Sequence, residues 1–272
     1  ELNVRPEQVE ATIDLLDGGA TVPFIARYRK EVTGALDDTQ LRQLEERLVY
    51  LREMSDRRTA ILSSIEEQGK MTDVLREQIL AAETKARLED LYLPYKQKRV
   101  TKGQQAIAAG LLPLADMLFN DPSKVPEAEA QAFIVAEAAE GGLAYPDVKA
   151  VLDGAKHILM ERFAEQADLL ALLRDYLKGR ALLSARVVAA KFQDYFAHDE
   201  ALAKVPSHRA LAMFRGRNEG FLSLNFTLPD TDDGVHPCEH LIANHVGIEA
   251  ANRPADVWLN EVVRWTWRVK LL

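Results

Sequence analysis

Cysteine, long apolar runs and an initiator methionine are scarce or missing in this sequence. Cys238 is the single cysteine among 272 residues, which excludes an internal disulfide framework and is typical of a reducing, cytoplasmic setting. No stretch approaches the roughly 20 consecutive apolar residues that a membrane-spanning helix needs, so we expect no membrane contact. The first residues, ELNVRPEQVE, lack a starting Met and the apolar core of a secretory signal, and we interpret them as a trimmed end.

The usual arrangements of catalytic and metal-ligating residues are also missing. The sequence contains no Gly-rich phosphate loop and no recognisable nucleophile–base pairing, so we expect no enzymatic activity. The segment HPCEHLIANH gathers His236, Cys238, His240 and His245. Its last two histidines are five residues apart, about 140° around a helix, and would not converge on zinc. Near residues 230–233 the glycine comes too early for a calcium loop. We therefore predict no cofactor and no bound metal.

Acidic residues outnumber basic ones. The 42 Asp and Glu side chains against 34 Lys and Arg give a net charge of −8, which argues against a protein that coats nucleic acid with its whole surface. Any contact with nucleic acid would therefore have to be local. A length of 272 residues and a hydrophobic fraction of 47% suffice for one large core, or for two cores that share an element.

Two short helices are predicted near the start of the chain. Pro6 and Pro23 suit the first turn of a helix, and Gly18 with its neighbour Gly19 separates the two apolar patterns. We expect helices over residues 6–17 and 22–30, a pair that fits a helix-turn-helix.

The second of these helices carries a local excess of positive charge. Phe24, Ile25 and Tyr28 share one arc of it, and three cations lie outside that arc: Arg27, Arg29 and Lys30. A helix that reads DNA bases carries its donors near its N-terminus, whereas here the cations lie at the C-terminal end, where they also favour the helix dipole. Sequence-specific DNA reading, phosphate contact and a packing role are the three open interpretations.

The longest predicted helix covers residues 38–68. Asp37 and Gln40 form a capping-box pattern at its start, and no Pro or Gly follows until Gly69. An apolar stripe is interrupted in the middle of the helix; it runs through Leu41, Leu44, Leu48 and Leu51, meets Ser55 and Arg58, and resumes at Leu62 and Ile65. We expect the two apolar ends to pack against different neighbours; a coiled coil is the alternative, and it would require a stripe sustained over more heptads.

Helical patterns continue to about residue 180, and strand character follows. The segments LLSARVV (182–188) and FLSLNFTL (221–228) predict a small pair of β-strands, and the residues between them are predicted to be mostly helical, with a cap at Ser207. The predicted fold class is mostly α: a multi-helix array with an N-terminal helix-turn-helix, a long connecting helix and a small β-strand pair in the C-terminal third. We divide the chain into a helix-turn-helix-like segment (1–36), the long connecting helix (37–69), a helical domain (70–180) and an α+β segment (181–272).

A basic stretch between two of these helices is the strongest candidate for binding nucleic acid. Four cations, Lys96, Lys98, Arg99 and Lys102, follow Tyr92 and Tyr95. We call these six residues the basic loop. Cations beside aromatic rings can bind phosphates and stack a base. The alternative is a solvated connector whose tyrosines pack inward.

Several sequence words in the chain resemble the Tex family of bacterial transcription accessory proteins. They include TVPFIARYRKEVTG, LDDTQLRQLEERL, ILSSIEEQGKMT, LEDLYLPYKQKRVTK, GLLPLADML, KFQDYF and PSHRALAMFRGRNEG, and they fall in the family's order over nearly the whole chain. A usual proline of the LYxPYKPKR word is Gln97 here, which weakens the expectation of a fixed loop shape.

The resemblance implies more domains than this chain contains. Tex proteins have an N-terminal helical region with a helix-turn-helix, then an RNase-H-like domain, helix-hairpin-helix elements and a C-terminal S1 domain that binds nucleic acid. A eukaryotic transcription elongation factor that handles histones shares much of this architecture. The chain looks like the N-terminal helical region, ending before the RNase-H-like domain, which with the later domains would be its partner within a longer protein.

From these patterns we expect the scaffold region of a Tex-like transcription accessory factor. It would make weak, non-specific contact with RNA or DNA through Arg27, Arg29 and Lys30 and through the basic loop. The alternative is a purely protein-binding module that docks on RNA polymerase or ribosome-associated partners. Salt dependence separates the two, because phosphate contacts weaken steeply with ionic strength and an apolar docking face does not.

Overall fold

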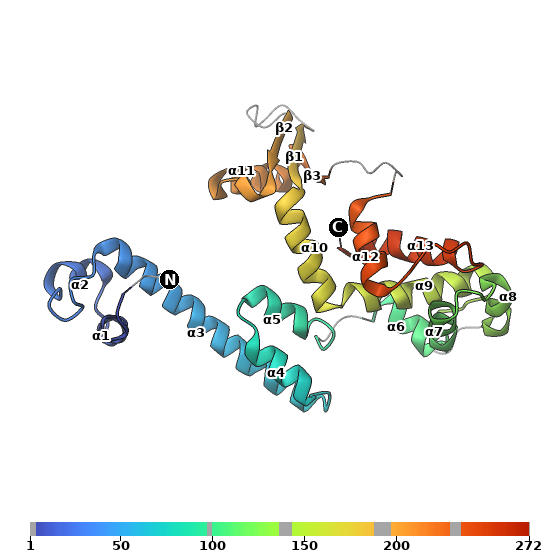
Figure 1. Ribbon diagram of the computed structural model, residues 1–272, viewed down its shortest axis with the longest axis horizontal. Helices are drawn as coiled ribbons and strands as arrows, with labels where there is room; N and C mark the ends of the chain where they lie inside the picture. Colours follow the sequence, from blue (N-terminus) through green and yellow to red (C-terminus); the bar gives the residue numbers. More distant parts are fainter. Residues whose placement is uncertain (1–3, 97–99, 136–142, 188–196, 229–234, 272) are drawn as a thin grey trace. The chain divides into compact units, whose positions relative to one another are not determined.

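The structure is a computed structural model that describes residues 4–96, 100–135, 143–187, 197–228 and 235–271. It divides into two compact units, residues 1–95 and 96–272. Both are mainly helical, which confirms the predicted fold class (Figure 1). The finer division into four segments stays a prediction. Among the described residues, no helix has both the length and the apolar character that crossing a membrane would require.

The first unit is built along one long helix. Its elements are α1 (Pro6–Asp17), α2 (Val22–Tyr28), α3 (Asp38–Glu67), α4 (Asp73–Ala81) and α5 (Lys85–Tyr92). At one end of α3, buried Leu41 and Leu44 join a small core with α1 and α2. At the other end α3 contacts α4 and α5. The prediction of different neighbours at the two ends is confirmed.

The start and end of α3 were correctly predicted. The Asp37 carboxylate accepts a hydrogen bond from the Gln40 amide N at 2.8 Å, and the Gln40 side-chain oxygen accepts one from the Asp37 amide at 3.0 Å, as in a capping box. The helix ends at Glu67, just before Gly69, whose φ of 65° lies in the left-handed region.

The predicted apolar stripe of α3 is confirmed at Ile65 but not at Leu62 or Leu51. The buried residues in the second half of α3 are Met54, Ile61 and Ile65, so Leu62 does not carry the packing, and Leu51 is 47% exposed. Arg58 lies in this buried register and is only half-exposed. Its guanidinium donates to the carbonyls of Ile79 (3.2 Å) and Ala82 (2.9 Å) at the C-terminal end of α4. A position that interrupts the predicted apolar stripe thus satisfies carbonyls that α4 itself leaves without partners.

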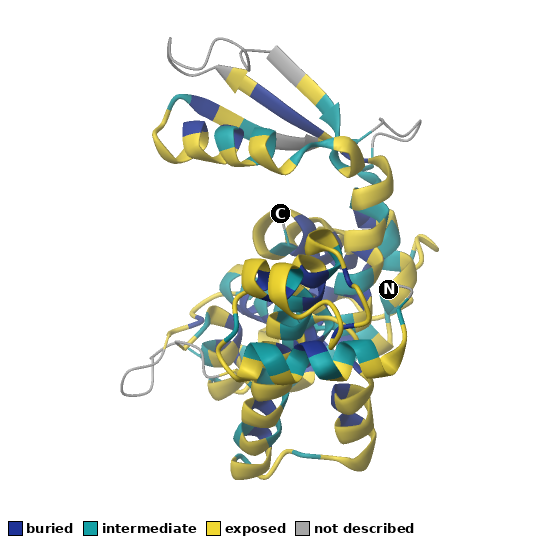
Figure 2. Cartoon of the chain, turned by 90° about the vertical axis from the view of Figure 1, so that its left-hand side faces the viewer, coloured by how far each residue is buried: buried dark blue, intermediate teal, exposed yellow. Residues whose placement is uncertain are grey.

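The second unit surrounds the buried helix α9 (Val148–Ala164). Its neighbours are α6 (Lys102–Ala108), α7 (Leu112–Asn120), α8 (Pro126–Ala130), η1 (Gln131–Phe133), α10 (Ala167–Arg180), α12 (Pro237–Val246), α13 (Asp256–Trp265) and the π-helical turn η4 (Thr266–Leu271). One hydrophobic core joins these elements, with Val151, Leu159 and Phe163 of α9 near its centre. Figure 2 colours the buried positions of these helices dark blue.

A three-stranded antiparallel sheet replaces the predicted strand pair. Its order is β2-β1-β3, with β1 (Leu182–Val187) in the middle, β2 (Ala197–Ala201) and β3 (Leu222–Thr227). Strand β2 lies in a segment predicted to be helical, and that prediction was wrong because pairing with β1 overrides the weak local preference of its residues. The turn η3 (Leu202–Lys204) and helix α11 (Ser207–Asn218) follow, and α11 covers one face of the sheet (Figure 2). The cap of α11 is Pro206 rather than Ser207.

Candidate nucleic-acid interface

Helix α2 presents two aromatic rings to solvent because of the way it is anchored. Val22 (2% exposed) and Ile25 (0%) hold its inner side in the small core with α1 and α3. At about 100° per residue, Phe24 and Tyr28 lie about 100° and 60° around the helix from Ile25, on the side away from Val22, and they are 41% and 56% exposed. Phe24, Ile25 and Tyr28 share one arc of the helix predicted from the sequence, but in the structure only Ile25 of these three is buried.

The exposed side of α2 brings cations and rings together. The rings of Phe24 and Tyr28 lie 5.3 Å apart between centroids, tilted by 48°. The Arg29 guanidinium carbon lies 5.3 Å from the Phe24 centroid, and that of Arg27 lies 6.0 Å from the Tyr28 centroid. Lys30 follows and is exposed. We call these five residues the α2 patch.

The turn that leaves α2 is held firmly by α1. The Gln8 side-chain amide donates to the carbonyls of Thr33 (3.0 Å) and Gly34 (2.9 Å). The carbonyl of Arg29 accepts from the Thr33 amide and hydroxyl, and Thr33 is fully buried. Gly34 has φ of 61°, a conformation that a side chain would strain. The backbone that carries Arg29 and Lys30 is thus fixed on both sides.

The cations of the α2 patch differ from other arginines of the first unit in their ion pairs. Among the ion pairs of the described residues, none includes Arg27, Arg29 or Lys30. Other arginines of the same unit do have acidic partners: Arg57 contacts Glu89 at 2.6 Å. An unpaired cation on a surface is available for a phosphate oxygen.

The basic loop also combines cations with two aromatic residues, but one of its rings is packed. Lys98 and Arg99 lie outside the described residues, while Lys96 and Lys102 are exposed. The Tyr92 hydroxyl lies 3.1 Å from the Ser64 hydroxyl, and the Arg57 guanidinium covers the Tyr92 ring at 5.2 Å. Tyr92 therefore packs inward, as the alternative interpretation of the loop requires.

The two ends of the basic loop are held by separate hydrogen bonds. Upstream, the Gln68 side chain donates to the Tyr95 carbonyl at 3.0 Å, and the Tyr95 side chain is partly exposed. Downstream, the Thr101 hydroxyl donates to the Glu161 carboxylate of α9 at 2.6 Å while it caps α6. A Cβ at Gly103 would collide with this carboxylate and would lie 3.0 Å from the His157 carbonyl. Only glycine therefore lets α6 approach α9 so closely.

Glu161 is a structural carboxylate beside Lys102. Its side chain is 14% exposed, and Lys270 contacts it at 3.0 Å. Burial by itself would raise the pKa of Glu161, but hydrogen bonds from Thr101 and Lys270 outweigh it and hold the pKa below its ordinary value. The pKa of His157 is lowered by burial and by the nearby Lys102 and Lys270.

The histidine–cysteine segment is a helix start. The His236 ring nitrogen Nδ1 accepts from the Cys238 amide at 3.2 Å, and the ring stacks on Trp267 at 5.0 Å. Burial raises the pKa of the Cys238 thiol to about 12, so it stays protonated. In the part of the chain that the structure describes, no three His, Cys, Asp or Glu side chains are grouped to hold a metal.

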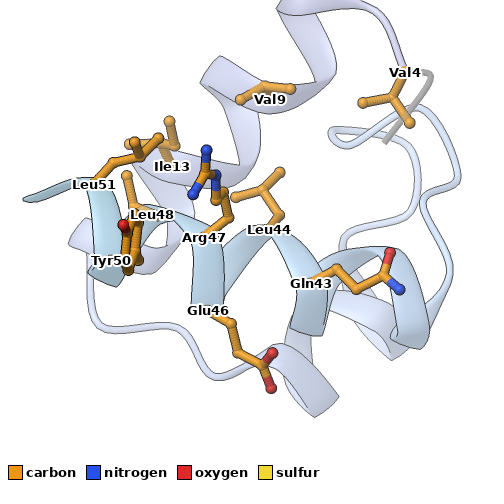
Figure 3. Close-up of a pocket in the computed structure, with 10 residues that line it drawn as sticks. All are labelled: Val4, Val9, Ile13, Gln43, Leu44, Glu46, Arg47, Leu48, Tyr50 and Leu51. Atoms are coloured by element: carbon orange, nitrogen blue, oxygen red, sulfur yellow. The ribbon is translucent and has the colours of Figure 1, made fainter. Parts of the chain in front are cut away.

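An apolar groove lies between α1 and α3. It has a volume of about 710 Å³. Figure 3 shows Val9 and Ile13 of α1 facing Leu44, Leu48 and Leu51 of α3, with Arg47 beside them. Leu48 and Leu51 belong to the predicted stripe that the fold leaves partly open. Such a surface suits apolar side chains better than phosphates.

Known families account for both units of this helical fold. Residues 1–66 match the Tex-like protein N-terminal domain, and residues 121–272 match the Tex central region-like domain. The chain belongs to the Tex family, as the sequence words indicated.

Named relatives extend over the chain. Protein YhgF of Escherichia coli (strain K12) is 58% identical over all of it, and Transcriptional accessory protein Tex of Neisseria gonorrhoeae is 49% identical over all of it. Human S1 RNA-binding domain-containing protein 1 is 28% identical over 84% of this chain, which covers 24% of that protein. The chain spans 36% of the length of each of the two bacterial relatives.

Proposed function

We propose that this chain is a scaffold region of a cytoplasmic Tex-like transcription accessory factor, and that it makes auxiliary contact with nucleic-acid backbone. One observation carries the proposal: three exposed cations of the α2 patch have no acidic partner among the described residues of a chain whose net charge is −8. The preserved local charge provides a phosphate-binding surface on an otherwise acidic molecule.

The geometry favours backbone contact over base reading. A reading helix places donors near its N-terminus in the major groove, whereas the first turn of α2 has the apolar sequence VPFI, which begins at Val22. Its cations lie in the last turn and just beyond, where long side chains can reach phosphates. The names of two relatives, one transcriptional accessory and one S1 RNA-binding, agree with a task near RNA. We propose no catalytic activity for this chain.

A binding titration at two salt concentrations tests the proposal. The probes are a fluorescein-labelled twelve-nucleotide RNA and a DNA duplex of equal length, and the variant is Arg27→Gln/Arg29→Gln/Lys30→Gln. We expect parent affinities of about 10⁻⁴ to 10⁻⁶ M, falling with salt, and a clear loss in the variant. Arg42→Gln is the matched control, because Arg42 is also exposed but already pairs with Asp38. Equal binding by parent and triple variant would refute the proposal.

The groove between α1 and α3 supports a second candidate function, docking of a protein partner such as RNA polymerase or a ribosome-associated protein. Its apolar lining would take apolar side chains of a helix or loop. Leu51→Asp should then abolish docking without changing nucleic-acid binding. Binding that is insensitive to salt and to the α2 cations would favour this second function.

A further inference from the structure

We infer that the α2 patch selects single-stranded nucleic acid by stacking unpaired bases on Phe24 and Tyr28. The inference rests on the proposed function and adds the substrate class and the residues that recognise it. Phe24 and Tyr28 are 41% and 56% exposed and do not belong to the core of the first unit, because Val22 and Ile25 supply the buried side of α2.

The spacing of the rings suits two separated bases. Phe24 and Tyr28 are one helical turn apart, and their centroids are 5.3 Å apart with a tilt of 48°. Two rings tilted against each other present separate faces rather than one continuous stack. The bases of a single strand can splay apart to meet such faces, whereas bases inside a duplex are stacked on their neighbours.

The cations complete the surface on which a strand could lie. Arg29 lies over Phe24 and Arg27 lies near Tyr28, so positive charge adjoins each ring. The Arg29 guanidinium uses one donor on the Tyr28 carbonyl at 3.0 Å and has further N–H groups for a phosphate. A base stacked on a ring would thus have a cation within reach of its own backbone.

The surface is already ordered before any strand binds. Gln8 fixes the turn after α2 through the carbonyls of Thr33 and Gly34, and buried Ile25 fixes the helix itself. Binding would therefore require little ordering of the backbone, and a small patch can contribute measurable affinity.

The charge of the patch favours nucleic acid over a protein partner. The apolar groove between α1 and α3 is lined mainly by aliphatic side chains, as expected of a protein-docking surface. The α2 patch instead joins aromatic rings with three cations that have no ion-pair partner among the described residues. Single-strand binding surfaces usually combine aromatic rings with cations.

Paired variants of the 272-residue chain separate stacking from charge. The probes are labelled twelve-nucleotide oligoadenylate and a twelve-base-pair DNA duplex, measured by fluorescence anisotropy. Phe24→Leu/Tyr28→Leu keeps apolar side chains but removes both aromatic faces, and Tyr28→Phe keeps the face while removing the hydroxyl. Phe214→Leu is the matched control, because Phe214 is 42% exposed beside Arg215 on α11 but lies outside the α2 patch.

We expect the double Leu variant to bind oligoadenylate about tenfold more weakly or worse, with an unchanged salt slope and unchanged duplex binding. Tyr28→Phe and Phe214→Leu should bind like the parent, and circular dichroism should show the parent's helix content throughout. Stacking would be overturned if the double Leu variant bound like the parent while the triple Gln variant bound weakly. That result would still support contact with the nucleic-acid backbone. Parent-like binding by both would overturn both claims and favour a protein ligand for the patch.

Discussion

The α2 patch and the basic loop have a similar composition, but the two regions place their aromatic rings differently. Each combines cations with two aromatic residues. In the α2 patch the rings are exposed and the cations have no ion-pair partner among the described residues. In the basic loop the Tyr92 hydroxyl is bound to Ser64, and the loop ends in the Thr101–Glu161 contact. Composition alone therefore does not show whether an aromatic ring beside cations is exposed or packed; the contacts of each ring do.

The largest expected effect comes from removing the anchor of the α2 patch. Ile25 is fully buried, so Ile25→Ala should lower the local unfolding free energy of α1 and α2 by about 3 kcal/mol. Hydrogen exchange of the amides in these helices measures this directly. Phe24→Ala, one residue away and exposed, should change it by less than about 0.5 kcal/mol. Similar losses in the two variants would mean that Phe24 also packs.

The contrast between the tyrosines is the next test. Tyr92→Ala removes a ring covered by Arg57 and a hydroxyl bound to Ser64, and should cost about 2 kcal/mol in unfolding free energy. Tyr28→Ala removes an exposed ring and should cost well under about 1 kcal/mol. Urea denaturation followed by circular dichroism compares them. Reversal of this order would contradict the assignment of Tyr92 to packing and Tyr28 to the surface.

A smaller effect is expected at the downstream end of the basic loop. Glu161→Gln weakens charge-assisted hydrogen bonds to Thr101 and Lys270, and should lower the unfolding free energy of the second unit by about 1.5 kcal/mol. Thermal unfolding at pH 7 measures the loss.

The same carboxylate makes the stability difference between the parent and Glu161→Gln depend on pH. Because the folded-state pKa of Glu161 is below its unfolded value, its stabilisation is present above the unfolded pKa, about 4.3, and is lost as pH falls through the folded pKa. The parent should lose more stability than Glu161→Gln between pH 5 and the acid limit of folding, at about pH 3 or below. Identical acid profiles would show that Glu161 is not held as described.

The elements that depend on local signals could be predicted from the sequence. The capping box of Asp37 and Gln40 and the stop at Gly69 fixed the bounds of α3 to within one residue. Strand β2 could not be predicted, because its conformation depends on pairing with β1, which the local sequence pattern does not show. The role of Arg58 was also hidden, since the carbonyls that it binds belong to α4, 21 and 24 residues further along.

The candidate site was predicted in part. The cations of α2 were identified by charge alone, but Phe24 and Tyr28 were missed as surface residues. Helical periodicity shows which residues share an arc; it does not show which arc meets the core. Apolar Val22 is the signal that could have placed both rings outside, since it lies about 160° from Phe24 and about 120° from Tyr28 around the helix.

The most direct test of the central claim compares the two basic regions in one assay. The measured quantity is the slope of log K against log salt for labelled oligoadenylate, with the parent, the triple α2 variant and Lys96→Gln/Lys98→Gln/Arg99→Gln/Lys102→Gln. At about 0.7 per phosphate contact on a single strand, the α2 variant should flatten the slope by about 2 and the loop variant by less than about 1. A flatter slope in the loop variant than in the α2 variant would contradict the account.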